Sequence, residues 1–98
     1  MKDFKNKIAV VTGGGTGMGR ELVLQLAEEG CHVAMCDVIA ENMEETFELV
    51  TKQSPDILVT KHICDVSDEE QVLRFKDEVL SQHETETINL LFNNAGIG

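Results

Sequence analysis

A glycine-rich stretch, TGGGTGMG from Thr12 to Gly19, joins an apolar segment to a helical pattern. Its flanks are too apolar for a flexible linker. At a junction of this kind the first backbone N–H groups of the helix are unpaired and carry partial positive charge. Glycine permits unusual backbone angles there and lets an anion touch the main chain. The stretch is therefore typical of a phosphate-binding turn.

The spacing of these glycines departs from the common G-x-G-x-x-G fingerprint of dinucleotide-binding turns, because position 18 is methionine. Gly13, Gly17 and Gly19 fit the pattern G-x-x-x-G-x-G instead. Taken alone, this pattern is also compatible with a helix-entry loop that binds no ligand.

A carboxylate, Asp37, lies eighteen residues after Gly19, at the end of a second apolar segment. In a dinucleotide-binding fold, a carboxylate at this place accepts hydrogen bonds from both hydroxyls of the adenosine ribose. It would also repel the extra phosphate of NADP, by about 4 kcal/mol for unit charges about 4 Å apart at an effective dielectric near 20. Its neighbours, Cys36 and Val38, offer no compensating positive charge. These residues favour NAD(H), and a helix N-cap or turn role for Asp37 is the alternative.

Apolar strand patterns and amphipathic helix patterns alternate along the chain, which predicts an α/β fold with a doubly wound parallel sheet. We predict strands at 7–12, 32–37, 57–64 and 88–92, and helices at 18–29, 40–52 and 67–83. Gly30 is expected to end the first helix, and Ser67 with Glu70 to form a capping box at the start of the third. The expected buried stripes are Met18, Leu22 and Leu26; Met43, Phe47 and Val50; and Val72, Phe75 and Val79.

Acidic residues outnumber basic ones in this chain of 98 residues, with 18 Asp and Glu against 8 Lys and Arg and a formal charge of −10. Nucleic acids and anionic membrane surfaces both require a basic face, so we expect neither as a partner. No apolar run is long enough for a membrane span, and we expect no signal peptide. The cysteines form no C-x-x-C pair and the histidines are scattered, so we expect reduced thiols in a cytoplasmic protein and no metal site.

Two further motifs lie at the ends of the third and fourth predicted strands: CDV at 64–66 and NNAG at 93–96. Four motifs thus follow four successive strands, at the sheet edge where ligands bind in open parallel sheets. In this order they resemble the short-chain dehydrogenase/reductase family, and the resemblance covers essentially the whole chain. It implies a partial Rossmann-type sheet of about four strands and three helices. The implied strand order is 3-2-1-4, with the first two helices on one face and the third on the other.

The resemblance also implies a role for each motif in binding NAD or NADH. The glycine turn would line the pyrophosphate and adenosine, Asp37 would bind the adenosine ribose, and Asp65 would bind the adenine amino group. The NNAG motif would run along the ribose. The implied cofactor-binding residues are Gly13, Gly15, Thr16, Gly17, Met18, Gly19, Asp37, Asp65, Val66, Asn93, Asn94, Ala95 and Gly96. Family members that prefer NADP often carry a basic residue where this chain has Thr16 or Val38, so NADP is disfavoured again.

One feature of the family is missing from this sequence. The family's chemistry uses a serine and a Tyr-x-x-x-Lys pair later in the chain, and this sequence contains no tyrosine. We therefore assign no catalytic residue. The fourth strand would also be an apolar sheet edge, which invites association unless another strand covers it. We interpret residues 1–98 as an NAD-binding half-domain, the amino-terminal part of a longer single-domain enzyme.

The implied function is that of an NAD-dependent oxidoreductase, which transfers hydride between a small-molecule alcohol or carbonyl compound and the nicotinamide. By the same resemblance, the full-length form is expected to be a homo-oligomer. One alternative is a non-catalytic NAD-binding module or subunit. A second is an S-adenosylmethionine methyltransferase, which also pairs a glycine turn with an acidic residue. It fits less well, because it does not call for the CDV and NNAG motifs.

Overall fold

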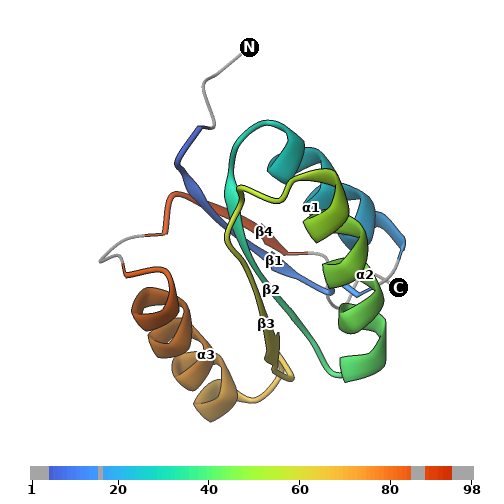
Figure 1. Ribbon diagram of the computed structural model, residues 1–98. Coiled ribbons are helices and arrows are strands. Elements are labelled where there is room, and N and C mark those ends of the chain that lie inside the picture. The colour runs from blue at the N-terminus through green and yellow to red at the C-terminus, as the bar shows by residue number, and fades with distance from the viewer. Residues whose placement is uncertain (1–4, 16, 85–87, 94–98) are drawn as a thin grey trace.

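A four-stranded parallel sheet forms the centre of the computed structural model, which describes residues 5–15, 17–84 and 88–93 (Figure 1). The strands are β1 (Ile8–Thr12), β2 (His32–Asp37), β3 (Val59–Ile63) and β4 (Leu90–Asn93). The helices are α1 (Gly17–Glu28), α2 (Ala40–Gln53) and α3 (Glu69–Gln82). The strand order is β3-β2-β1-β4, and every neighbouring pair is parallel. This order confirms the predicted 3-2-1-4 topology.

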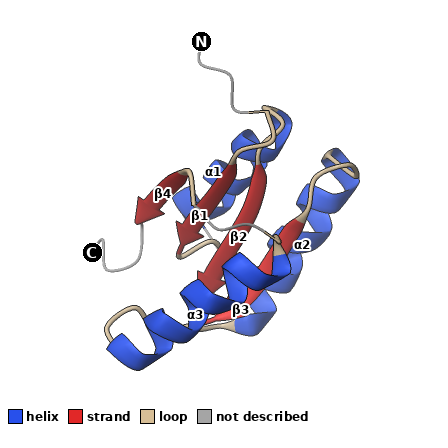
Figure 2. Cartoon of the chain, turned by 90° about the vertical axis from the view of Figure 1, so that its left-hand side faces the viewer, coloured by secondary structure: helices blue, strands red, loops and turns tan. Residues whose placement is uncertain are grey.

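The helices cover both faces of the sheet, as a doubly wound fold requires (Figures 1 and 2). Side chains of alternate strand residues point to opposite faces. One face carries Ala9, Val11, Val33 and Met35, which pack with buried residues of α1 and α2. The other face, which carries Ile8, Val10, Ala34 and Cys36, packs with Phe75 and Val79 of α3. Both predictions of helix placement are confirmed.

The buried stripe of α1 differs from the predicted one. Met18 is 76% exposed and Leu22 is half-buried, whereas the buried residues are Gly19, Val23, Leu26 and Ala27. The cause lies at Gly19, where an added Cβ would overlap the carbonyl oxygen of Gly13. Only the glycine face of α1 can approach the turn this closely, so this contact sets the rotation of the helix.

Several element boundaries differ from the prediction by one or two residues, and hydrogen bonds account for two of them. The third strand begins at Val59 rather than at residue 57. The N–H of Ile57 donates to the carbonyl of Ser54 in the preceding turn, and the N–H of Leu58 donates to Nδ1 of His32, 3.0 Å away, rather than to the backbone of β2. Helix α3 is capped by Asp68, whose carboxylate accepts from the N–H groups of residues 70 and 71. Ser67 is therefore not the cap, because its hydroxyl bonds to Asp65 instead.

Gly30 ends α1 as predicted, with a φ of 93° that favours glycine. Because all four strands run in one direction, their carboxyl ends meet at one edge of the sheet. Within the described residues β4 lies at the side of the sheet, and its Leu91 is 68% exposed. The shared edge of strand ends brings the sequence motifs together.

Candidate functional site

The glycine turn folds back onto the end of β2. The N–H groups of Gly13 and Gly14 both donate to the carbonyl of Cys36, at 2.8 Å and 3.1 Å. Gly13 has a φ of 68° and Gly17 a φ of 56°, values that L side chains rarely adopt. The turn therefore depends on glycine at these two positions for its backbone path.

Glycine is required for a different reason inside the turn. A Cβ on Gly14 would lie 2.7 Å from Cβ of Met35, and one on Gly15 would lie 2.6 Å from Oδ2 of Asp37. These are contacts that real Cβ atoms essentially never make. The turn thus packs directly against β2, with no room for side chains between them.

Asp37 ends β2 and joins it to the turn. Its Oδ2 accepts the N–H of Gly15 at 3.0 Å, and its Oδ1 accepts the N–H groups of Val38 at 2.7 Å and Ile39 at 3.3 Å. The side chain is half-buried. Three backbone donors therefore hold this carboxylate at the mouth of a pocket.

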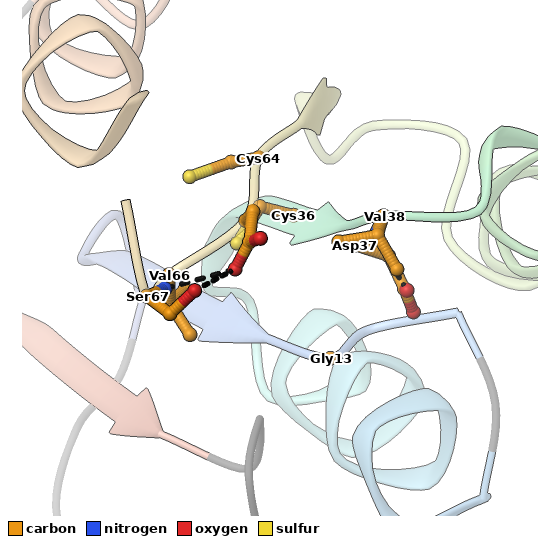
Figure 3. A pocket seen from close by; sticks show the side chains of 8 residues that line it. Gly13, Cys36, Asp37, Val38, Cys64, Val66 and Ser67 are labelled. Atoms are coloured by element: carbon orange, nitrogen blue, oxygen red, sulfur yellow. Dashed lines mark hydrogen bonds between the residues drawn. The ribbon is translucent and has the colours of Figure 1, made fainter. Parts of the chain in front are cut away.

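The pocket has a volume of about 370 Å³ and opens at the carboxyl ends of β1, β2 and β3 (Figure 3). Its lining residues are Gly13, Cys36, Asp37, Val38, Cys64, Asp65, Val66 and Ser67. Four of the predicted site residues, Gly13, Asp37, Asp65 and Val66, thus meet around one cavity. The lining holds two carboxylates and no Lys or Arg among the described residues, so its charge is negative.

Asp65 is held by Ser67, the residue predicted from the sequence to cap the third helix. Its Oδ1 accepts the hydroxyl of Ser67 at 2.7 Å and the Ser67 N–H at 2.9 Å (Figure 3). The bond from the Ser67 hydroxyl, and next the bond from its N–H, lower the pKa of the Asp65 carboxyl. An ionised, oriented acceptor therefore stands at the end of β3, where it can receive a hydrogen bond from an amino group.

Two cysteine thiols also line the pocket, although the sequence predicted no part for them in the site. Cys36 and Cys64 are buried, on neighbouring strands, and each directly precedes an acidic pocket residue. Burial, with the nearby Cys64 thiol, raises the pKa of Cys36 to about 12. Both thiols are therefore neutral, polarisable parts of the pocket floor. The sequence feature that could have identified these two cysteines is their position, one residue before Asp37 and Asp65.

Other predicted site residues lie elsewhere or outside the described residues. Gly17 and Met18 are exposed at the start of α1 and do not line the pocket. The backbone of Asn93 pairs with Thr12 of β1, which places the end of β4 beside the turn. Thr16, Asn94, Ala95 and Gly96 lie outside the described residues.

In the described ranges, no group of three or more His, Cys, Asp or Glu side chains is arranged to hold a metal ion. No helix in the described part of the chain is long and apolar enough to cross a bilayer.

The sequence matches the family model of the short chain dehydrogenases over residues 7–98. Levodione reductase from Leifsonia aquatica is 36% identical over 94 residues, which are 96% of this chain and 34% of that protein. The crystal structure of levodione reductase aligns with a TM-score of 0.90 at 36% identity, covering 96% of this chain and 36% of that one. The structure of NAD+-bound xylitol dehydrogenase aligns with a TM-score of 0.88 at 36% identity, covering 97% and 35%.

The chain therefore belongs to the short chain dehydrogenase family. It spans about a third of the length of the relatives it matches. The family and the Rossmann-type fold that the sequence motifs implied are both confirmed.

Proposed function

We propose that this chain forms the adenosine-binding half of an NAD-dependent oxidoreductase. The observation that carries the proposal is the Asp37 carboxylate, held by the glycine turn at the mouth of a pocket shared with Asp65. The NAD+-bound xylitol dehydrogenase and a short chain dehydrogenase from Burkholderia phymatum in complex with NAD, 33% identical at a TM-score of 0.87, support the choice of cofactor.

The residues present fit such a cofactor at several points. A Cβ at Gly15 would fill the space in front of Asp37, and a Cβ at Gly17 would meet no protein atom within 4 Å, so the backbone at the start of α1 is open to a ligand. Asp37 would accept the ribose hydroxyls, and Asp65 the adenine amino group. Val38 and Val66, which line the pocket, would lie against the faces of the adenine ring. When bound, the nicotinamide supplies the hydride acceptor or donor.

The backbone N–H groups divide into two sets. Those of residues 13–15 already bond to Cys36 and Asp37, and so hold the turn in place. A diphosphate would therefore be held by the first N–H groups of α1, which starts at Gly17. The turn therefore fixes the geometry of the site, and the amino-terminal end of α1 would bind the diphosphate.

Selectivity for NAD over NADP follows from the charges around the pocket. The described lining residues include two carboxylates and no cation, so the 2′-phosphate of NADP would meet Asp37 without a counter-charge. The repulsion is about 4 kcal/mol for unit charges about 4 Å apart at an effective dielectric near 20. NADP should therefore bind much more weakly than NAD.

The alternative is a binding module without catalysis. The two functions differ in turnover and agree in cofactor binding. Under the enzyme proposal, the complete protein oxidises secondary alcohols or reduces carbonyl compounds with NAD(H). Under the alternative, it binds NADH and shows no turnover.

A titration of NADH, read by its fluorescence, tests the proposal. The chain contains no Trp or Tyr, so the protein adds little emission of its own. NAD and ADP-ribose should displace NADH, NADP should displace it far less well, and nicotinamide mononucleotide should not compete. Displacement by S-adenosylmethionine at lower concentration than by NAD would favour a methyltransferase and sink the NAD assignment.

A further inference from the structure

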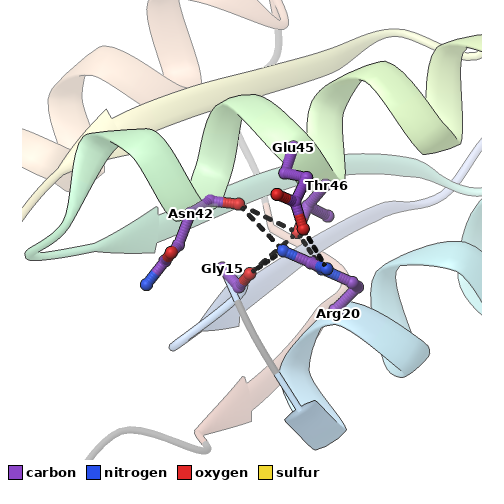
Figure 4. A network of polar contacts seen from close by, with 5 residues as sticks. All are labelled: Gly15, Arg20, Asn42, Glu45 and Thr46. Carbon is purple, nitrogen blue, oxygen red and sulfur yellow. Dashed lines mark hydrogen bonds and ion pairs between the residues drawn. The ribbon is translucent and has the colours of Figure 1, made fainter.

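A cluster of polar contacts behind the glycine turn is centred on Arg20 of α1 (Figure 4). Its Nη2 donates to the carbonyl of Gly15 at 2.7 Å and lies 3.3 Å from the carbonyl of Asn42. Its Nε donates to the hydroxyl of Thr46 at 2.9 Å, and its Nη1 to Oε1 of Glu45 at 2.7 Å. One side chain thus joins the turn to α2.

Thr46 completes the contacts on the Gly15 carbonyl. It is fully buried on α2, and its hydroxyl lies 3.1 Å from that oxygen. Both backbone polar groups of Gly15 are therefore held, the carbonyl by Arg20 and Thr46 and the N–H by Asp37. Glycine has more backbone freedom than any other residue, so these bonds decide where its N–H points.

We propose that Arg20 is a positioning residue of the site: with Thr46 it fixes Gly15, and Gly15 in turn fixes the Asp37 carboxylate for the ribose. We call Arg20, Thr46 and the Gly15 carbonyl the latch. The latch lies outside the residues that line the pocket, and Arg20 reaches the ligand only through other groups. This inference rests on the function proposed above.

The ion pair with Glu45 is a minor part of the contact. The Glu45 side chain is 69% exposed and that of Arg20 is 22% exposed. Surface ion pairs contribute little, because water screens them and both side chains lose freedom. The bonds from the guanidinium to the Gly15 carbonyl and the Thr46 hydroxyl are charge-assisted and better shielded. Positioning should therefore depend on Arg20 and Thr46 and hardly on Glu45.

The latch also bears on cofactor selectivity. All three guanidinium nitrogens of Arg20 are already engaged, by Thr46, Glu45 and the two backbone carbonyls. Four of the five N–H donors of this cation are thus bonded within the protein rather than free for a 2′-phosphate. Removing Asp37 would remove the repulsion of NADP without supplying a partner for its phosphate.

The decisive experiment is a double-mutant cycle on NADH affinity, measured by fluorescence titration of the full chain. Arg20→Gln in the parent should weaken binding about tenfold, the scale of losing one charge-assisted hydrogen bond. In an Asp37→Ala background, the same change should cost less than about twofold, because no carboxylate remains to be positioned. An equal loss in both backgrounds would show that Arg20 acts on the fold alone and would overturn the proposal.

Three further variants sharpen the cycle. Glu45→Gln removes the ion pair but keeps the bonds to Gly15, and a loss as large as that of Arg20→Gln would overturn the proposal. Glu44→Gln is the matched surface control. Glu44 directly precedes Glu45 in the chain, and the change breaks its own ion pair with Lys61. If Arg20→Gln fails to fold, Thr46→Val replaces it: binding should weaken, and Thr46→Ser should restore it.

The failure of this inference is distinguishable from failure of the proposed function. If Asp37→Ala weakens NADH binding and Arg20→Gln does not, only the positioning role is wrong. If Asp37→Ala binds NADH as tightly as the parent, the ribose assignment is wrong and the positioning role is wrong with it.

Discussion

The backbone N–H of Gly15 donates a hydrogen bond to Oδ2 of Asp37, 3.0 Å away and 22 residues later in the chain. A Cβ on residue 15 would lie 2.6 Å from the same oxygen. Gly15 is not among the residues with positive φ, so the backbone angle does not demand glycine there. Glycine is required instead by the Asp37 carboxylate together with Cβ of Asn42, which would lie 2.7 Å from the added atom. The turn and the end of β2 are thus fitted to each other, and a change in either should alter what the site binds.

Replacement of Asp37 tests the ribose assignment and the origin of selectivity together. Asp37→Ala should weaken NADH binding at least about tenfold, since hydrogen bonds to a charged group contribute about 1.5–3 kcal/mol. It should also relax the discrimination against NADP. Titration of both cofactors by calorimetry measures this ratio.

Asp37→Asn separates charge from shape in the same experiment. The amide oxygen can replace only one of the two carboxylate oxygens as acceptor, either for the Gly15 N–H or for the N–H groups of Val38 and Ile39, while the negative charge is gone. If repulsion causes the selectivity, the asparagine variant should relax it as far as the alanine variant does. Discrimination that persists in Asp37→Asn would assign the selectivity to pocket shape.

A side chain at Gly19 should abolish cofactor binding. A Cβ there would overlap the carbonyl oxygen of Gly13, so the turn must move away from α1. We expect Gly19→Val to bind no NADH while the far-ultraviolet circular dichroism keeps most of its helical signal. Gly30→Ala is the control, because its φ of 93° makes alanine strained at a site remote from the pocket. It should lower the melting temperature and leave NADH affinity unchanged.

The strands and the fold class could be predicted because apolar residues and helix patterns alternate so regularly along the chain. The phase of α1 could not. Met18, Leu22 and Leu26 form as good a helical stripe as Gly19, Val23 and Leu26, and a backbone contact with Gly13 decides between them. Local pattern gives the period of a helix, whereas its rotation depends on what it packs against.

The site was predictable to the extent that its residues follow strand ends. Asp37 and Asp65 share the pocket because parallel strands end at one edge. The roles of Ser67 and Arg20 were not predictable in this way. Ser67 and Asp68 are both good capping residues, and the hydrogen bond to Asp65 decides which one caps. Arg20 finds its partners on α2, 25 and 26 residues away, and a single sequence does not show such pairs.

The pocket thiols should react slowly in the folded protein. Burial raises the pKa of Cys36 to about 12, so its thiolate, the nucleophile, is scarce at neutral pH. Iodoacetamide labelling followed by mass spectrometry should show slow modification of Cys36 and Cys64. Saturating NADH should slow both further and leave the rate at Cys31 unchanged, because Cys31 does not line the pocket. Equal protection of all three would indicate general stabilisation rather than cover by the cofactor.

A chain of hydrogen bonds connects β3 to α3 beneath the sheet. Nδ1 of His62 lies 2.8 Å from Oε1 of Glu78, and Nε2 of His62 lies 2.8 Å from the hydroxyl of Thr60. The same hydroxyl lies 2.8 Å from Nε2 of His83. If Nδ1 of His62 donates to the carboxylate, then Thr60 donates to His62 and His83 donates to Thr60. Nδ1 of His83 is then a buried acceptor, and it has no hydrogen-bond partner among the described residues.

Protonation of His83 should therefore oppose folding. Burial, with smaller contributions from His32 and His62, lowers the pKa of His83 from 6.5 to about 4. Between these two values the unfolded chain binds a proton that the folded chain does not, so stability is complete above pH 6.5 and falls as the pH drops toward 4. The loss is at most about 3.5 kcal/mol, from about 1.4 kcal/mol for each pH unit of that interval.

Urea unfolding of the parent and of His83→Gln at a series of pH values measures this contribution. The glutamine variant should be less stable at pH 7.5, because its amide replaces a fitted ring, yet its stability should change less with pH. The carboxylates are common to both proteins, so the difference between the two curves isolates His83. Parallel curves from pH 7 to pH 4 would show that His83 titrates alike in the folded and unfolded chains, and that the unpaired nitrogen is accessible to a proton.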